Sequence, residues 1–148
     1  VPTPKSRRIF VSIIKFAIKT KTMGLVYSEI TLSNPVKPSV NSLPVKCLAD
    51  TGATFLAIPE NIASQLQLET LEMRNATIAD GSVKPVPYVG PVKVSFNERS
   101  CYTGALVLGN EVLLGAVPMQ DMDLVVMPKF HSIAVNPDSP NIPRAIMK

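Results

Sequence analysis

Short apolar runs separated by turn residues dominate the chain from residue 25 onward. Residues 25–32 alternate approximately between apolar and polar side chains, and this pattern predicts a half-buried strand. Further strands are predicted at 44–49, 55–58, 101–108, 111–114 and 130–135, with a helix at 59–68 and room for two helical turns at 117–124. The pattern therefore predicts a mostly-β domain with one or two short helices.

A hairpin is predicted within residues 73–96. The Asp-Gly pair in Ala79-Asp80-Gly81-Ser82 lies between two apolar stretches, which is a strong signal for a tight turn between strands. The second strand carries three prolines between Lys84 and Val94, so we expect an edge or bulged strand there. Residues 136–148 form a proline-punctuated tail that we expect to pack little.

Length and composition agree with one small folded domain. The chain has 148 residues, of which 46% are hydrophobic and 18% charged, and these values exclude a disordered polyelectrolyte. The net charge of +4 is unevenly placed, because residues 1–22 contain six Lys or Arg and no acid. The remainder carries nine basic against eleven acidic residues, so no nucleic-acid partner is expected.

We expect residues 1–22 to be a peripheral basic extension, with the domain beginning at residue 23. The apolar run 9–18 is about half the roughly 20 residues of a membrane span, and Lys15 interrupts it, so stable membrane insertion is not expected. No small-residue cleavage site follows, so a secretory signal is not expected either. An alternative makes this segment an arm that contacts a membrane surface or nucleic acid.

The two cysteines, Cys47 and Cys101, could pair once, but we predict reduced, packed thiols. Neither cysteine belongs to a C-x-x-C pair, and the single His131, which we expect at the surface, cannot complete a usual zinc set. Reduced thiols favour the cytoplasm.

A single carboxylate interrupts the apolar sequence CLADTGATFLAIP (47–59). Burying an unpaired carboxylate costs several kcal/mol, so Asp50 is either on an exposed turn or retained for chemistry. Asp50-Thr51-Gly52 can form an ordinary turn, since Asp and Thr make local hydrogen bonds and Gly accepts positive φ. Two more features follow in order, however: the hairpin turn about thirty residues later, and Leu113-Leu114-Gly115 before a short helix.

This ordered combination resembles the retropepsin-type aspartic proteases, the single-domain relatives of pepsin that include retroviral proteases and a set of bacterial proteins. The resemblance covers residues 23–135 and implies an acid-protease barrel that acts as an aspartic endopeptidase on peptide or protein substrates. It implies no metal and no organic cofactor. Peptide hydrolysis by carboxylates needs two of them, and this chain has one such motif, so the expected unit is a homodimer with Asp50 from each copy.

The resemblance also assigns roles to the neighbours of Asp50. The amide of Gly52 donates a hydrogen bond to the carboxylate, and the hydroxyl of Thr51 locks the two loops across the dimer axis. Structural support is expected from Ala53 and Thr54 in the loop and from the strand segment Leu113, Leu114 and Gly115 beneath it.

The hairpin turn Ala79, Asp80, Gly81 and Ser82 occupies the place of the flap that closes over substrate. It departs from the retroviral pattern, because it has one glycine and a charged residue at the tip. The stretch 34–44 is also longer and richer in proline than a minimal retroviral hairpin.

Other residues are expected to be structural. Tyr88 is predicted to be a strand tyrosine, and Asp121 and Asp123 are predicted to be solvated or capping groups, because residues two apart on a helix do not face each other. The rival to the peptidase hypothesis is a catalytically inactive dimer of the same fold that binds peptides or acts as a scaffold.

Overall fold

The structure is a computed structural model, and it describes residues 25–147. The predicted basic extension 1–22 lies outside the described residues. Within the described part, no helix is long and apolar enough to cross a membrane.

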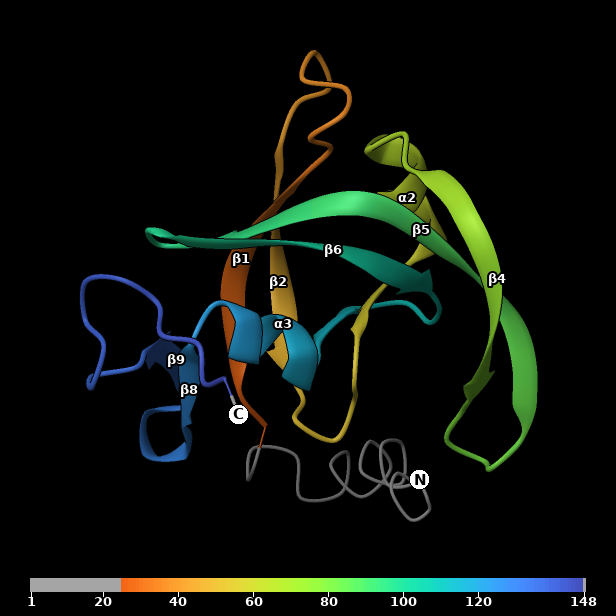
Figure 1. Cartoon of the computed structure of the whole chain (residues 1–148). Helices are drawn as coiled ribbons and strands as arrows, with labels where there is room; N and C mark the ends of the chain where they lie inside the picture. The colour runs from red at the N-terminus through yellow and green to blue at the C-terminus, as the bar shows by residue number, and fades with distance from the viewer. Residues whose placement is uncertain (1–24, 148) are drawn as a thin grey trace.

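A seven-stranded sheet forms most of the described chain (Figure 1). Its elements are β1 (Tyr27–Ser33), β2 (Leu43–Ala49), β3 (Leu56–Ile58), α2 (Glu60–Gln65), β4 (Glu69–Thr77), β5 (Val83–Phe96), β6 (Arg99–Val107), β7 (Val112–Leu114) and α3 (Ala116–Asp121). The strand order is β1-β2-β7-β3-β6-β5-β4, and β1 also pairs with β5. This extra pairing closes six strands into a barrel and leaves β4 attached outside, so the predicted mostly-β domain with short helices is confirmed.

The barrel core consists of aliphatic side chains from nearly every strand. All three residues of β3 are buried, since this strand lies between β7 and β6. The largest fully buried aliphatic side chains are Ile30, Leu32, Leu56, Ile58, Leu66, Val92, Val94 and Leu114. Each contributes about 1.5–3 kcal/mol relative to an exposed position. Cys47 and Cys101 are buried beside them, and both are free, as predicted.

Two of the three prolines of β5, Pro85 and Pro87, lie in the part of this strand that pairs with β4 alone. β5 pairs with β4, β6 and β1, so it is not an edge strand as a whole. Both prolines precede Tyr88, the first residue of β5 that pairs with β6. Within the described residues, the side of β5 away from β4 has no ladder partner here, so a proline that lacks an N–H group is tolerated. The predicted irregularity is present as a register shift between Val89 and Val92.

Asn34 ties the proline-rich loop between β1 and β2 to the end of α2. Its buried side-chain amide donates to the carbonyl oxygens of Leu66 and Gln67, at 2.9 and 3.2 Å. Its side-chain oxygen accepts the N–H groups of Val36 and Lys37, at 3.0 and 3.1 Å. The helix itself is shorter than predicted, because Gln67 adopts a left-handed conformation with φ of 54°.

The sequence prediction missed one strand near the C-terminus. β8 (Leu124–Met127) and β9 (Ser132–Val135) form a separate antiparallel hairpin, joined through the 3-10 turn η1 (Pro128–Phe130). Strand β9 begins two residues later than predicted. β8 was not predicted because Asp123, with φ of 56°, ends the preceding helix without a glycine signal.

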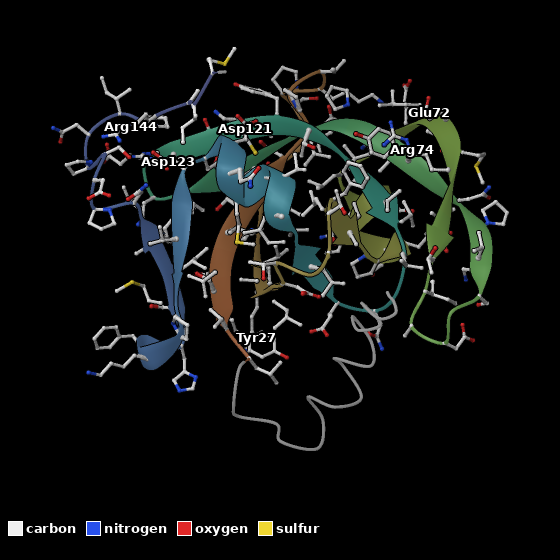
Figure 2. All side chains as sticks on the ribbon, turned by 60° about the horizontal axis from the view of Figure 1, so that its bottom comes forward. Tyr27, Glu72, Arg74, Asp121, Asp123 and Arg144 are labelled. Carbon is white, nitrogen blue, oxygen red and sulfur yellow. The ribbon has the colours of Figure 1, made fainter. Side chains whose placement is uncertain are left out.

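The C-terminal tail is anchored to the domain at Ser139 and Arg144, although the described residues after Ser139 are all exposed. Ser139 is buried, its hydroxyl donates to the carboxylate of Asp123, and its carbonyl accepts from the buried guanidinium of Arg99. The backbone N–H of Arg144 also donates to Asp123, at 2.9 Å, and both residues lie at one corner of the molecule in Figure 2. Asp123 is therefore a hydrogen-bond centre rather than a solvated or capping group, whereas Asp121 is exposed.

Candidate active site

Asp50 follows the last residue of β2 directly and is held by backbone groups. Its N–H donates to the carbonyl of Leu114 on the neighbouring β7, at 3.0 Å. The next loop turns back at once, since Ala53 N–H donates to the Asp50 carbonyl at 3.0 Å and Gly52 N–H donates to Asp50 Oδ1 at 2.9 Å. Asp50 is only 8% exposed, so these contacts fix the orientation of a buried carboxyl group.

The loop after Asp50 rests on the start of α3. Ala116 N–H donates to the Ala53 carbonyl at 2.8 Å, and Val117 N–H donates to the Thr54 carbonyl at 2.9 Å. Gly115 makes this approach possible, because a Cβ atom there would lie 2.3 Å from the carbonyl oxygen of Phe55. The structure therefore brings the Asp50 loop together with the Leu113-Leu114-Gly115 segment that the sequence analysis grouped with it.

Polar side chains of the loop face outward in the single chain. Thr51, Gly52 and Thr54 are exposed, whereas Ala53 is half-buried. Leu113 and Leu114 of β7 are buried below them. The loop thus presents two hydroxyl groups at the surface and apolar groups toward the interior.

The hairpin formed by β4 and β5 turns at Ala79–Ser82, as the Asp-Gly pair predicts. The turn is closed by Ile78 N–H to the Ser82 carbonyl at 2.9 Å, and Gly81 has φ of 87°, which suits glycine. Asp80 Oδ1 accepts both the N–H and the hydroxyl of Ser82, at 2.8 and 2.6 Å. Figure 1 shows this turn at the lower end of the molecule, the end at which the loop between β2 and β3 also lies.

A group of three side chains joins the loop to this hairpin, and the sequence analysis did not identify it. Phe55 comes from the loop after Asp50, Arg74 from β4 and Tyr88 from β5. The two rings meet edge to face with centroids 6.3 Å apart, and the Arg74 guanidinium carbon lies 3.7 Å from the Tyr88 centroid. Tyr88 packs on Gly104 of β6, where a Cβ atom would lie 2.2 Å from the ring.

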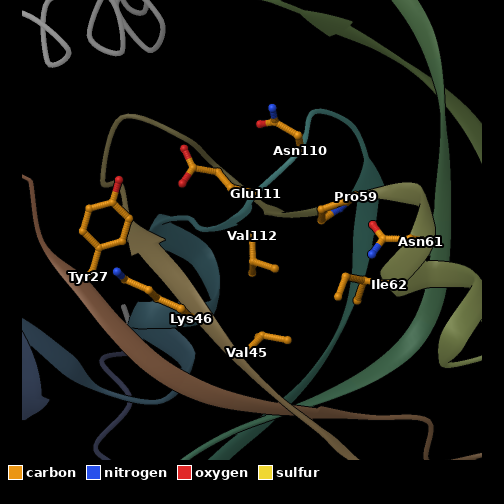
Figure 3. Close-up of a pocket in the computed structure, with 9 residues that line it drawn as sticks. All are labelled: Tyr27, Val45, Lys46, Pro59, Asn61, Ile62, Asn110, Glu111 and Val112. Atoms are coloured by element: carbon orange, nitrogen blue, oxygen red, sulfur yellow. The ribbon is translucent and has the colours of Figure 1, made fainter.

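An open pocket of about 510 Å³ lies beside β2, and Figure 3 shows the nine residues that line it. They are Tyr27, Val45, Lys46, Pro59, Asn61, Ile62, Asn110, Glu111 and Val112. None of them belongs to the Asp50 loop or the hairpin turn. Burial raises the pKa of Glu111, opposed by the nearby charge of Lys46, and Lys46 lies 4.7 Å from the ring centroid of Tyr27.

No group of three or more His, Cys, Asp or Glu within residues 25–147 is arranged to hold a metal ion. The chemistry available at the loop is that of the Asp50 carboxyl group and the backbone amides around it.

Comparison with known proteins gives a family for this arrangement. No curated protein matches the chain in sequence. Among solved structures, the chain is similar to the protease of simian foamy virus (mac), with 16% identity, a TM-score of 0.40, and coverage of 62% of this chain and 91% of the protease. It is also similar to a Legionella pneumophila protein of unknown function, with 14% identity, a TM-score of 0.36, and coverage of 78% of this chain and 95% of that protein.

The match to a protein family covers more than half of the sequence. Residues 36–135 match the family described as "gag-polyprotein putative aspartyl protease". The matched range contains the Asp50 loop, the hairpin and β7, and it confirms the resemblance to retropepsin-type proteases. The chain therefore belongs to the gag-polyprotein, retroviral-type aspartyl protease family.

Proposed function

We propose that this chain is an aspartic endopeptidase that acts as a homodimer, with a water molecule activated between the Asp50 carboxyl groups of two copies. The observation that carries the proposal is the state of Asp50, which is buried at the end of β2 and oriented by backbone hydrogen bonds. Burial of a carboxyl group has an energetic cost, and perturbed carboxyl groups concentrate at functional sites.

The proposed chemistry uses the two carboxyl groups in different protonation states. Two like charges about 3 Å apart cannot both ionise, so a pair of this kind shares one proton. The ionised group takes a proton from water as the water oxygen attacks the peptide carbonyl carbon, and the protonated group donates to the carbonyl oxygen. Collapse of the tetrahedral intermediate then breaks the C–N bond, with a proton passing to the leaving nitrogen.

The second carboxyl group is proposed to come from a second copy of the chain. The Asp-Thr-Gly triplet occurs once in the sequence, and a twofold axis through the loop would bring two Asp50 side chains together. The exposed hydroxyl of Thr51 is then placed to bond across that axis. Gly52 orients the carboxylate, while Ala53, Thr54 and the segment Leu113–Gly115 support the loop.

The hairpin of β8 and β9 supports dimer formation. It lies outside the seven-stranded sheet, so the outer edges of its two strands are not paired with that sheet. Val125 and Ala134 face each other on the side of the hairpin opposite to Leu124 and Ile133, which are buried in the core. Edge-to-edge pairing with a second copy would build a four-stranded sheet that satisfies more backbone groups.

The turn Ala79, Asp80, Gly81 and Ser82 is proposed to be the flap. A hairpin above the Asp50 loop can add backbone hydrogen bonds to an extended peptide and exclude water during the reaction. The internal hydrogen bonds of Asp80 with Ser82 make this turn a compact unit that can move as one piece.

The first experiment is cleavage of a diverse, unstructured peptide pool by the full chain at acidic and near-neutral pH. Asp50→Asn, which keeps the shape of the side chain, is run beside it, and folding of both is checked by circular dichroism. Cleavage by the parent and none by the variant is expected. Peptide binding without cleavage in both folded proteins would instead support the inactive scaffold.

A mixing experiment tests whether the site is shared between copies. A ninefold excess of Asp50→Asn over the parent leaves about one parent chain in ten with a parent partner, if subunits exchange freely. We therefore expect about a tenfold loss of activity for each parent chain. Unchanged activity for each parent chain would show that one copy carries a complete site.

A further inference from the structure

The contact of Phe55, Arg74 and Tyr88 lies on the face of the hairpin that looks toward the Asp50 loop. On β4 and β5, Glu72 pairs with Tyr88 and Arg74 pairs with Val86, so these four residues share one face. Phe55 contacts that face through the Tyr88 ring, and the Arg74 guanidinium carbon lies 5.5 Å from the Phe55 centroid. A cation is therefore present where the hairpin meets the loop.

The Arg74 guanidinium group is held in place by its neighbours, and its ion-pair partner Glu72 is exposed to solvent. The Arg74 guanidinium carbon lies over both rings, 3.7 Å from the Tyr88 centroid and 5.5 Å from the Phe55 centroid, and these cation–π contacts restrain the side chain. Its planar fork of donors suits bidentate contact with a carboxylate. Its Nε donates to Glu72 at 2.6 Å, and the two side chains lie beside each other in Figure 2. Both are exposed to solvent, with side-chain exposures of 35% for Arg74 and 54% for Glu72. An exposed pair of this kind is weak enough for an incoming carboxylate to compete with Glu72.

The distance from Asp50 fits a substrate side chain close to the cleaved bond. The turn from Asp50 to Ala53 keeps their Cα atoms within about 7 Å, and two further residues to Phe55 add at most about 7 Å. An extended peptide advances about 3.3 Å per residue, so the Cα atom of Phe55 lies within about four substrate residues of Asp50. The Arg74 guanidinium carbon lies 5.5 Å beyond the Phe55 centroid, which places it within about seven substrate residues.

We propose that Arg74, held on Tyr88 and Phe55, selects substrates that carry Asp or Glu within about seven residues of the cleaved peptide bond. This inference rests on the proposed peptidase function and adds the substrate class to it. Glu72 acts as an internal competitor that occupies the guanidinium group when no acidic side chain is bound. When an acidic substrate binds, its carboxylate thus replaces Glu72 as the partner of Arg74.

The test uses the full chain and the same peptide pool, with the products sequenced by mass spectrometry. The parent is expected to favour Asp or Glu over Asn or Gln by roughly five- to tenfold in kcat/KM at one position within about seven residues of the cut. Arg74→Glu is expected to replace this preference with one for Lys or Arg. Glu72→Gln is expected to strengthen the acidic preference, because it removes the competitor.

Lys93→Glu is the matched control. Lys93 of β5 also lies over a ring, 5.9 Å from the centroid of Tyr102 on β6, but it is five residues along β5 from Tyr88. It is expected to leave the preference unchanged. If Arg74→Glu lowers the thermal midpoint below the assay temperature, Arg74→Gln, which keeps the packing stem without the charge, is used instead and should lose the preference.

The outcomes separate this inference from the function on which it rests. Absence of cleavage by the parent, or cleavage that persists in Asp50→Asn, refutes the peptidase proposal and the substrate class with it. Cleavage that depends on Asp50 but shows no acidic preference, or the same preference in Arg74→Gln, refutes the role of Arg74 alone.

Discussion

Gly115→Ala tests how closely the Asp50 loop depends on the strand beneath it. A Cβ atom at this position would lie 2.3 Å from the Phe55 carbonyl oxygen, 2.7 Å from that of Ala53 and 2.8 Å from the carbonyl carbon of Thr54. All three are backbone atoms, so no change of rotamer relieves the contact. Heavy atoms prefer separations of about 3.5 Å, and the loop must therefore move by roughly 1 Å.

The expected cost has two parts. Overpacking of a filled site costs about 1–3 kcal/mol, and weakening of the hydrogen bonds from Ala116 and Val117 to the loop adds about 0.5–1.5 kcal/mol each. We expect the free energy of unfolding to fall by about 2–6 kcal/mol. Displacement of a reacting group by about 1 Å lowers rates about 100-fold, so kcat/KM should fall by a similar factor in the folded fraction.

Urea unfolding followed by circular dichroism measures the first quantity, and cleavage of one fixed peptide by folded samples measures the second. Gly109→Ala is the control, because Gly109 has φ of 76° and nothing within 4 Å of the added methyl group. Its cost is limited to about 1–2 kcal/mol of backbone strain, with normal cleavage. Equal stability and equal activity in the two variants would refute the steric reasoning.

Three further predictions concern stability and reactivity. The pKa of Asp123 is lowered from 3.8 to about 2, first by the Ser139 hydroxyl and then by the N–H of Arg144, so its ionised form stabilises the fold fully above about pH 4. That contribution is lost as pH falls through about 2. Asp123→Asn should therefore flatten the dependence of the free energy of unfolding in urea on pH between about 2 and 5. Parallel pH curves for the parent and the variant would contradict this. Burial raises the pKa of the Cys47 and Cys101 thiols to about 12, so iodoacetamide at pH 8 should label them rapidly only in urea, and fast labelling of the native chain would count against the buried packing. Asn34→Ala should lower the free energy of unfolding by about 2–3 kcal/mol, because the buried Leu66 carbonyl and the partly buried N–H groups of Val36 and Lys37 lose their partner. An unchanged urea midpoint would be inconsistent with these contacts.

The elements that sequence reasoning predicted correctly are those defined by neighbouring residues. The β4–β5 hairpin follows from an Asp-Gly pair within its own turn, and the loop after β2 follows from a four-residue motif. The end of α3 was missed, because Asp123 takes the left-handed conformation that glycine usually marks. Alternation of side chains does not reveal such a position. The helical turns were therefore predicted to run to residue 124, the first residue of β8, and the rest of β8 was not assigned to a strand.

Contacts between distant residues were the least predictable. Arg99 and Ser139 are forty residues apart, and only the folded barrel brings the guanidinium group beneath the tail. Phe55 and Tyr88 likewise belong to separate segments whose distance depends on the path of β5 across the sheet. Each residue alone has an ordinary strand or tail interpretation, which is why the sequence did not identify the group.

The closure of the barrel sets a condition on how the chain reaches its native state. Leu32 of β1 pairs with Val94 of β5, about sixty residues later, and this pairing closes the ring whose other four strands are β2, β7, β3 and β6. Loop closure over such a distance has a large entropic cost, and folds rich in distant pairings form slowly, in milliseconds to seconds. During synthesis, the backbone groups of β1 that pair with β5 remain unpaired until β5 has left the ribosome. The interval before closure is therefore the period in which this chain is most exposed to aggregation.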